Sequence, residues 1–410
     1  MAARLRFWVI ADDLTGALDT AAPFAAHGWR TCVVPWPDTA LATMAASLRR
    51  TAAVSDVVVI DTASRHVAPS EAARRVRQGV TAARRADAGG PGACFYKKID
   101  STLRGNVAVE LAAFRTATAV ACLPLAPAFP AQGRTTREGA VWVDGRPLRE
   151  SASAKDVLGR APSGVLAHLA PAGALEVFDA MTDADLRRVA TRLARQARLA
   201  AVAGSGGFAG AIAARFGSPR RATGARAIPG GLLVVSGSAH PAAHAQARAL
   251  VAAGALGLIA PIDARVPIRD RRATEILAID ALSAGRTVVL ACPGLAAGAH
   301  LPMRRALVAA TRLAAIARAV VTAGPVGAVF TVGGDTTEAL VAAMGWAPLT
   351  VDGALVPGVG VVRLQARSGG AAGPRWLITK SGAFGDPQTL RRLVRRLTAA
   401  RGLERPSTTP

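Results

Sequence analysis

Short apolar runs rich in β-branched residues alternate along the chain with longer, alanine-rich segments in which apolar residues recur at helical spacing. The short runs have the length of buried strands, and the longer segments have the period of amphipathic helices. Strands that alternate with helices form βαβ units and mostly parallel sheets. The predicted strands are 5–11, 56–60, 93–97, 119–123, 200–203, 232–236, 287–291, 326–331 and 375–379, and the predicted helices include 69–86, 104–116, 183–199, 241–253, 303–323 and 335–345.

Residues 215–231 interrupt this alternation, because they are rich in Gly, Pro and Arg and show no periodicity. A chain of 410 residues is also too long for one ordinary domain. We therefore expect an α/β fold of two domains, 1–225 and 226–400, each a mostly parallel sheet flanked by helices, with the active site in the cleft between them. The polar tail 401–410 is expected to be disordered.

Composition narrows the classes of function. The net charge of +23 is typical of nucleic-acid binding, but 46 of the 50 basic residues are arginines, spread along helical faces without interleaved aromatic residues. We therefore expect no nucleic-acid partner. The four cysteines lie far apart and predict neither zinc nor disulfides, and no uncharged apolar stretch reaches the length of a membrane helix. The N-terminal apolar run is too short for a signal peptide, and we expect a cytoplasmic protein without a membrane partner.

The first candidate site is the stretch VIADDLTGALDTAA, residues 9–22, in which a strand runs into two adjacent aspartates. Asp13 or Thr15 would cap the helix that follows, a contribution of about 1 kcal/mol. One cap accounts for one of these residues and not for both carboxylates. We expect Asp12, nearer the strand end, to face a substrate.

Two further polar clusters lie in the first half of the chain, each directly after a predicted strand. Ligands bind at the carboxyl ends of strands in open α/β sheets. YKKIDSTLRGN (96–106) combines the only adjacent lysines of an arginine-dominated chain with Arg104, which suits a bound anion. DTASRH (61–66) offers Ser64 and Arg65 for a carboxylate, or forms an ordinary turn. The loop PAFPAQGRTTREG (127–139) either folds over a site or only connects two elements.

Three glycine turns follow strands in the second half: SGSAHP (236–241), TVGGDTTEA (331–339) and TKSGAFGD (379–386). Glycines let backbone amides approach phosphate oxygens, and a following helix N-terminus favours negative charge. Together they predict a nucleotide triphosphate site. The P-loop motif GxxxxGK[ST] is absent, and GSGGFA (204–209) lacks the downstream acid of a dinucleotide site, since residues 186–262 contain no Asp or Glu.

These stretches, in this order, resemble the four-carbon acid sugar kinase family. The matching segments are IADDLTGALDTA, DTASRH, YKKIDSTLRGN, PAFPAQGRT with VDGRPLRES, DAMTDADL, GSGGFA, GGDTTEAL and KSGAFGDP, from residue 10 to residue 387. The resemblance implies an ATP-dependent kinase that phosphorylates the terminal (4-) hydroxyl of 3-oxo-tetronate, D-threonate or D-erythronate. It implies that the N-terminal domain binds the acid sugar and that the C-terminal domain binds ATP.

Carried over residue by residue, the resemblance implies two sets of contacts. Substrate contacts fall at Asp12, Ser64, Arg65, Lys98, Asp100 and Arg104. ATP contacts fall at Ser236, Gly237, Ser238, His240, Gly333, Gly334, Asp335, Thr336, Lys380, Ser381, Gly382 and Gly385. The chain departs from the family twice: its GSCS turn here ends in Ala239-His240, and an Asp-Pro stretch is replaced by ASAKDVLGRAPSG (152–164).

The mechanism expected from these residues is phosphoryl transfer by positioning and charge neutralisation. Asp12 or Asp13 orients or deprotonates the attacking hydroxyl, or Asp335 acts as the base. Arg65 and Lys98 hold the substrate carboxylate, Asp335 reaches an ATP-bound Mg²⁺ through water, and domain closure excludes water. No metal site held by protein side chains alone is predicted. Three alternatives stay open: a kinase of another small hydroxy-acid, a non-catalytic ligand-binding regulator, and an arginine-rich nucleic-acid binder. The oligomeric state is also open, with a homodimer as one option.

Overall fold

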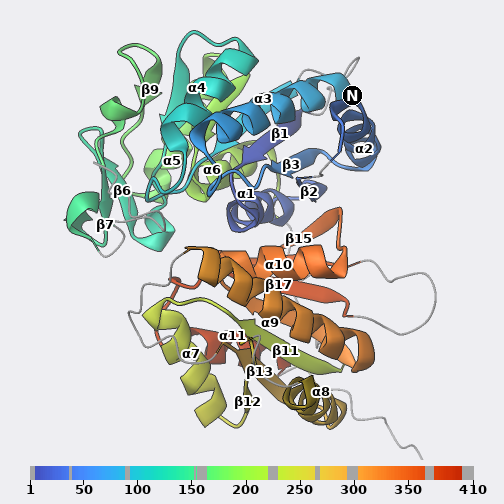
Figure 1. The fold of residues 1–410 in the computed structure, drawn as a ribbon. Helices are drawn as coiled ribbons and strands as arrows, with labels where there is room; N and C mark the ends of the chain where they lie inside the picture. The colour runs from blue at the N-terminus through green and yellow to red at the C-terminus, as the bar shows by residue number, and fades with distance from the viewer. Residues whose placement is uncertain are drawn as a thin grey trace, which may run out of the picture. The chain divides into compact units, whose positions relative to one another are not determined.

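The computed structural model describes residues 5–36, 39–87, 93–151, 154, 164–219, 230–263, 268–292, 303–364 and 374–398. The chain divides into two compact units (Figure 1). Unit 1 comprises Met1–Arg221 and Ala347–Gly353, and unit 2 comprises Ala222–Trp346 and Ala354–Pro410. The predicted tail and most of the segment 152–164 lie outside the described residues.

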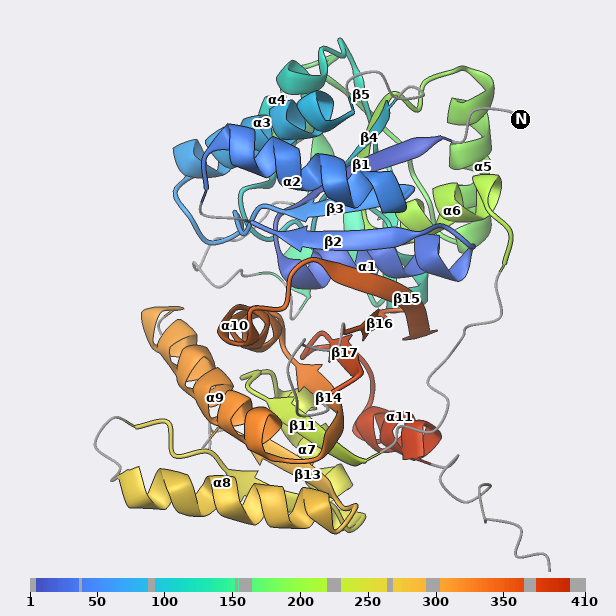
Figure 2. The same ribbon diagram turned by 90° about the vertical axis from the view of Figure 1, so that its right-hand side faces the viewer.

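Unit 1 is a sheet with helices on both faces (Figure 2). Its strand order is β15-β2-β3-β1-β4-β10-β5-β9, parallel throughout except for β15. The strands are β1 (Arg6–Ala11), β2 (Thr31–Pro35), β3 (Val57–Asp61), β4 (Ala93–Lys98), β5 (Leu123–Ala126), β9 (Leu175–Val177), β10 (Ala201–Gly204) and β15 (Leu349–Val356). The helices are α1 (Leu14–Ala26), α2 (Leu41–Val54), α3 (Pro69–Ala86), α4 (Val107–Thr118), α5 (Asp183–Arg195) and α6 (Gly206–Phe216).

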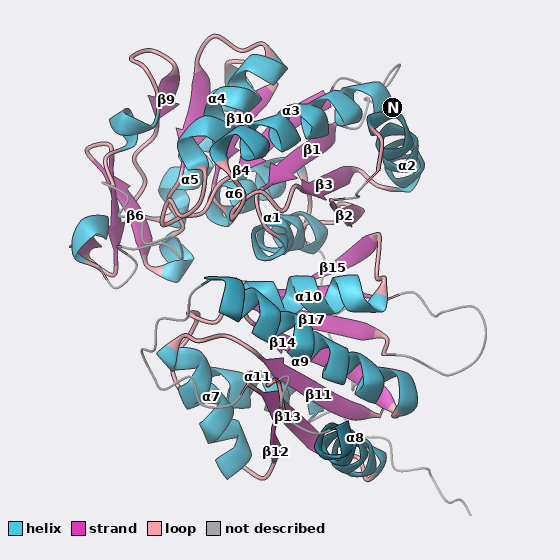
Figure 3. Ribbon diagram, in the orientation of Figure 1, coloured by secondary structure: helices cyan, strands magenta, loops and turns pink. Residues whose placement is uncertain are grey.

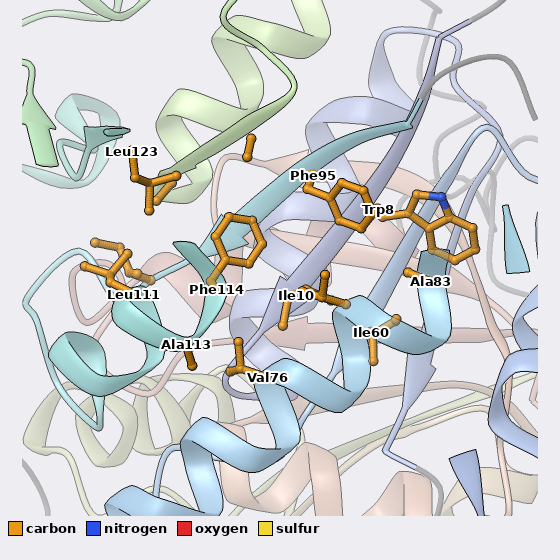
Figure 4. Packing of buried hydrophobic residues seen from close by; sticks show 14 of the residues in the cluster. Trp8, Ile10, Ile60, Val76, Ala83, Phe95, Leu111, Ala113, Phe114 and Leu123 are labelled. Carbon is orange, nitrogen blue, oxygen red and sulfur yellow. The ribbon is translucent and has the colours of Figure 1, made fainter. Parts of the chain in front are cut away.

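Strand β1 shows why the sheet is covered on both faces. Trp8 and Ile10 point into a core shared with α2, α3 and α4 (Figure 4). Phe7 points the other way, where its ring lies 5.1 Å from that of Phe24 on α1. A strand buried on both faces reads as a continuous apolar run, which is the pattern of a central parallel strand.

A small antiparallel sheet in unit 1 was not predicted from the sequence. It consists of β6 (Arg134–Arg137), β7 (Ala140–Val143) and β8 (Arg146–Pro147), and it follows a short 3₁₀ turn, Pro130–Gln132. The loop 127–139 therefore does more than connect two elements, because it forms this sheet's first strand.

Unit 2 repeats the alternation of strands and helices (Figure 3). Its strand order is β12-β13-β11-β14-β17-β16, with only β16 antiparallel to its neighbour. The strands are β11 (Gly231–Ser236), β12 (Leu256–Ile259), β13 (Thr287–Ala291), β14 (Val326–Val332), β16 (Val359–Arg363) and β17 (Trp376–Lys380). The helices are α7 (Pro241–Ala252), α8 (Ile268–Ser283), α9 (Met303–Ala323), α10 (Gly334–Met344) and α11 (Thr389–Thr398).

Helices also cover both faces of the unit 2 sheet. The core that contains Leu232, Phe330 and Ile378 is closed by α7 and α11. Helix α9 packs against both α8 and α10. The stretch Arg305–Ala323 of α9 is the one described helix long and apolar enough by composition to cross a membrane. Its Leu313, Ile316 and Val320 are fully buried, as expected for the core helix of a globular domain.

The α/β fold with mostly parallel sheets confirms the prediction, and one predicted strand is misplaced. Residues 119–123 were expected as a strand, but the strand β5 begins at Leu123. Ala119 instead ends α4 in a left-handed conformation (φ 59°) and donates to the last carbonyls of that helix. The apolar residues 119–123 therefore begin at the C-cap of α4, and only Leu123 belongs to the sheet.

Candidate active site

Three neighbouring parallel strands of unit 1 end at one edge of the sheet, and each is followed by predicted site residues. β1 lies between β3 and β4 in the strand order. The loops after them carry the carboxylate–cation cluster, which we define as Asp12, Asp13, Arg65, Lys98, Asp100 and Arg104. The C-terminal edge of a parallel sheet is where ligands bind in such folds.

Arg65 is the hub of this cluster. Its Nε donates to Asp12 Oδ2 at 2.7 Å, and its Nη1 lies 2.5 Å from Asp13 Oδ2. Its Nη2 lies 3.7 Å from Asp100 Oδ1. The backbone amides of Ser64 and Arg65 also donate to the carbonyl of Asp12. These contacts neutralise three carboxylates that would otherwise repel one another at one sheet edge.

The two adjacent aspartates have different roles. Asp13 is the N-cap of α1, and its Oδ1 accepts from the amide of Gly16 at 2.8 Å. Asp12 is 2% exposed, and its Oδ1 is buried without a hydrogen-bond partner among the described residues. Of the two predicted caps, Asp13 and Thr15, the structure shows Asp13 as the N-cap. The orientation of Asp12 towards a substrate stays a prediction.

The pKa values of the two carboxyls shift in opposite directions. Burial by itself raises the pKa of Asp12, but the positive charges of Arg65, Lys97 and Lys98 outweigh it and hold that pKa below the ordinary value. Burial raises the pKa of Asp13, and the neighbouring Asp12 charge adds to this effect against the opposing charge of Arg65. Asp12 is therefore ionised at neutral pH and acts as a hydrogen-bond acceptor.

Asp100 is held by its own loop. Burial raises its pKa, but Arg104 and Arg65 outweigh burial and hold the pKa of this carboxyl well below its usual range. Arg104 donates to it through Nε at 2.9 Å and Nη2 at 2.7 Å. The hydroxyl of Thr102 donates at 2.5 Å. Such a bidentate pair fixes the geometry of both partners.

The Ser64 hydroxyl contacts Glu110, which lies outside the carboxylate–cation cluster. Ser64 is fully buried, and its hydroxyl donates to Glu110 Oε1 at 2.6 Å. The other oxygen of Glu110 pairs with Lys97 Nζ at 2.8 Å, and both of these side chains are buried. Lys97 and Glu110 were not among the predicted site residues, because a helix interior position such as 110 gives no sign of its partner. These contacts assign Ser64, in this structure, to the support of the β3–α3 turn.

Lys98 lies against the first turn of α1. Its side chain is 4% exposed, and Nζ donates to the carbonyl of Ile99 at 2.8 Å. A Cβ at Gly16 would come within 2.9 Å of this Nζ and 2.6 Å of Asp13 Oδ1. The glycine of the DDLTG stretch therefore makes room for the lysine and for the capping carboxylate.

In unit 2 the three predicted glycine turns converge. Strands β11, β14 and β17 are neighbours in the sheet, and the turns follow their C-terminal ends. The amide of Gly333 donates to Lys380, and the amide of Gly237 donates to Val332. A Cβ at Gly237 would collide with the hydroxyl of Thr336, and one at Gly382 with that of Ser238. Close backbone approach of this kind suits phosphate binding, with the N-termini of α7 and α10 beside the turns.

The predicted ATP contacts take distinct positions around these turns. His240 is the N-cap of α7, and its Nδ1 accepts from the amide of Ala242 at 3.2 Å. Asp335 lies in the first turn of α10. Gly385 adopts a positive φ of 86°, and Gln246, which was not predicted, donates to the carbonyls of residues 384–386. Ser236 is the last residue of β11, Gly334 is the first residue of α10, and Ser381 lies in the turn after β17.

Lys380 is a buried cation at the end of β17. It is 1% exposed, and Nζ donates to the carbonyls of Ser381 and Phe384 at 2.7 and 2.9 Å. Burial lowers the pKa of this lysine to about 8. An anion bound beside it would compensate the desolvated charge, so this side chain fits a phosphate.

Comparison with known proteins finds one family model in each half of the chain. Residues 7–169 match the model of a sugar-binding N-terminal domain, and residues 233–390 match that of a nucleotide-binding C-terminal domain. A D-threonate kinase of Bordetella bronchiseptica is 33% identical over 96% of this chain and 98% of its own length. The chain belongs to the four-carbon acid sugar kinase family.

Two further proteins are similar over most of this kinase. A 3-oxo-tetronate kinase of Methylobacterium radiotolerans is 28% identical over 92% of the chain and 95% of its own length. A solved structure from Salmonella typhimurium, described as a tRNA synthase, has a TM-score of 0.71 at 21% identity and covers 95% of the kinase and 99% of its own chain. At that identity the likeness shows the fold alone.

Two residues of the kinase that sequence reasoning did not place in the site lie close to the cluster. Asp19 is on α1, one turn beyond Gly16. Burial and the charge of Asp13 raise its pKa to about 6, against the opposing charge of Lys98. Arg134 starts β6 and interacts electrostatically with Asp100, Asp144, Arg104 and Asp19. Asp19 lies within the candidate stretch 9–22, and its spacing of three residues from Gly16 places it on the same helix face.

The GSGGFA stretch of the kinase is a packing motif of unit 1. It joins β10 to α6, and a Cβ at Gly206 would lie 3.0 Å from the carbonyl of Asp19 and 3.1 Å from the ring of Phe129. These glycines let α6 approach both α1 and the loop before β6.

Proposed function

We propose that this kinase transfers the γ-phosphoryl group of ATP to the terminal (4-) hydroxyl of a four-carbon acid sugar, namely D-threonate, D-erythronate or 3-oxo-tetronate. Relatives that carry these three names support the substrate class. The observation that carries the proposal is the buried Oδ1 of Asp12, which has no partner among the described residues, beside the cations of the cluster. A buried carboxylate oxygen requires a donor, and a substrate hydroxyl supplies one.

Asp12 then orients the attacking hydroxyl. Arg65 fixes the carboxylate through Oδ2 and leaves Oδ1 to accept a hydrogen bond from the attacking hydroxyl. Because the pKa of Asp12 is lowered, it is ionised before substrate binds and contributes chiefly alignment. Asp13 remains engaged with the helix and with Arg65.

The nucleotide phosphates are proposed to bind to the turns at 236–238, 333–336 and 380–382. Lys380 offers a compact charge, and the turn amides offer donors. Mg²⁺ bound to ATP phosphates neutralises charge in phosphoryl transfer and needs one or two protein carboxylates. Asp335, in the first turn of α10, is the side chain that would reach this ion through water.

A coupled ATP assay over a panel of four-carbon acids tests the proposal. Turnover is expected with at least one tetronate, and Asp12→Asn should lower kcat by about 10²–10⁴-fold. Silence of the wild-type protein across the panel would contradict the substrate class and favour another small hydroxy-acid or a non-catalytic regulator. Full activity of Asp12→Asn, with a loss in Asp335→Asn, would assign the activation of the hydroxyl to Asp335 in unit 2.

A further inference from the structure

A four-carbon acid sugar carries a carboxylate that must meet a cation, and most cations of the cluster already face protein carboxylates. Arg65 contacts Asp12 and Asp13 and approaches Asp100. Arg104 donates hydrogen bonds to Asp100 through both Nε and Nη2. Of the two cations predicted to hold the substrate carboxylate, Arg65 is thus neutralised within the protein, whereas Lys98 donates to the carbonyl of Ile99.

Arg134 differs from these arginines. Its Nη1 donates to the backbone carbonyl and to the side-chain oxygen of Gln132, at 2.5 and 2.9 Å. Its Nε is buried and has no acceptor, and no carboxylate lies at ion-pair distance from it, among the residues that the structure describes. Burial lowers the pKa of Arg134 against the attraction of Asp100, as expected for a cation without a direct counter-ion.

The backbone holds Arg134 rigidly. Its amide donates to the carbonyl of Phe129, and the amide of Phe129 donates back to Arg134 at 2.8 Å. Gly133, at φ 72°, closes the turn between them. The hydroxyl of Ser205 donates to the carbonyl of Ala128 at 2.5 Å and ties this loop to the start of α6.

We propose that Arg134 is the residue that recognises the carboxylate of the acid sugar, through the guanidinium edge formed by Nε and Nη2. Nη1 is the nitrogen already anchored, so the opposite edge is left for a planar, bidentate acceptor. This inference rests on the proposed function, and it assigns Arg65 to the orientation of Asp12 rather than to the substrate carboxylate.

Arg134→Gln, Arg134→Lys and Arg137→Gln test it. Arg137 is the matched control, since it lies on the same strand, is exposed and stacks over the Trp142 ring at 5.2 Å. The readouts are KM and kcat for the best tetronate of the panel, KM for ATP, and the kcat/KM ratio between that tetronate and its uncharged amide. Calorimetric titration of the tetronate without ATP measures binding separately from turnover.

Arg134→Gln should raise KM and Kd for the tetronate about 10- to 100-fold, leave KM for ATP unchanged and reduce the preference for acid over amide by a similar factor. Arg134→Lys should recover part of the affinity, and Arg137→Gln should match wild type. Unchanged tetronate affinity in Arg134→Gln, or equal losses for acid and amide, would overturn the inference. If the wild-type protein binds the acid without turnover and Arg134→Gln abolishes binding, the kinase proposal fails while the role of Arg134 stands.

Discussion

The Lys98 ammonium packs against Gly16 at the first turn of α1, in the space that a side chain at position 16 would fill. The ammonium of Lys98 lies where a side chain at position 16 would begin, 2.9 Å from an ideal Cβ. The same Cβ would come within 2.6 Å of the Asp13 carboxylate that caps the helix. One glycine thus sets the position of a cation and of a cap at the site.

Gly16→Ala should lower kcat/KM by about 10- to 100-fold, because small displacements of a positioning group have effects of that size. Alanine favours a helix over glycine by about 1 kcal/mol, so stability should change less than activity. Steady-state kinetics and thermal unfolding measure the two. Gly210→Ala on α6 is the control, since its Cβ meets only Pro23 at 3.5 Å. Wild-type kinetics in Gly16→Ala would show that Lys98 does not need this space.

Glu110→Gln should destabilise the protein by about 3–5 kcal/mol, because it leaves the fully buried Lys97 without its counter-charge. Glu71→Gln is the matched control: Glu71 pairs with Arg74 and Arg75 at the surface of α3, where an ion pair contributes at most about 1 kcal/mol. Denaturant unfolding compares the two variants. Equal, small losses would mean that the buried pair contributes no more than a surface pair.

Nucleotide affinity should fall as pH rises through about 8, the pKa of Lys380 in the free protein. Below that pH the lysine is charged and attracts phosphate, and above it the free protein must take up a proton on binding. Lys380→Met should bind ATP more weakly and lose this pH dependence between pH 7 and 9. Titration calorimetry at several pH values measures the ATP affinity of both proteins. A wild-type affinity that does not change between pH 7 and 9 would show that Lys380 does not contact the phosphates.

Asp19→Asn should stabilise the protein at neutral pH by about 1–3 kcal/mol. A carboxyl whose pKa rises from 3.8 to about 6 on folding binds protons more tightly in the folded state, so its contribution is fully present below pH 3.8 and lost as pH rises through 6. The unfolding temperatures of variant and wild type should therefore diverge between pH 4 and 6 and run parallel above. A constant difference across that range would contradict the assigned shift.

The central strands were predictable because parallel strands covered on both faces are almost continuously apolar, as in Val57–Asp61 and Thr287–Ala291. Strand β15 was not, since its residues alternate between buried and more exposed positions and include Asp352 and Gly353. Its place depends on partners more than three hundred residues away, at Thr31 to Val33. No local pattern encodes that pairing.

The candidate site was predictable at the level of strand ends, because residues after adjacent parallel strands meet at one edge. The hydrogen-bond or ion-pair partner of each side chain was not predictable. Ser64 turns to Glu110, and Arg134 enters from a separate small sheet. These choices depend on burial and on competition between neighbours, which spacing along the chain does not report.

The pairing of Leu349–Val351 with β2 has a practical consequence for anyone who would dissect this protein. A gene fragment that stops near residue 225 encodes almost all of unit 1 yet omits the strand that covers its outermost edge. The exposed backbone of Thr31–Pro35 would then recruit strands from other molecules. On the ribosome, likewise, the first unit gains its last strand only after most of the second has been synthesised.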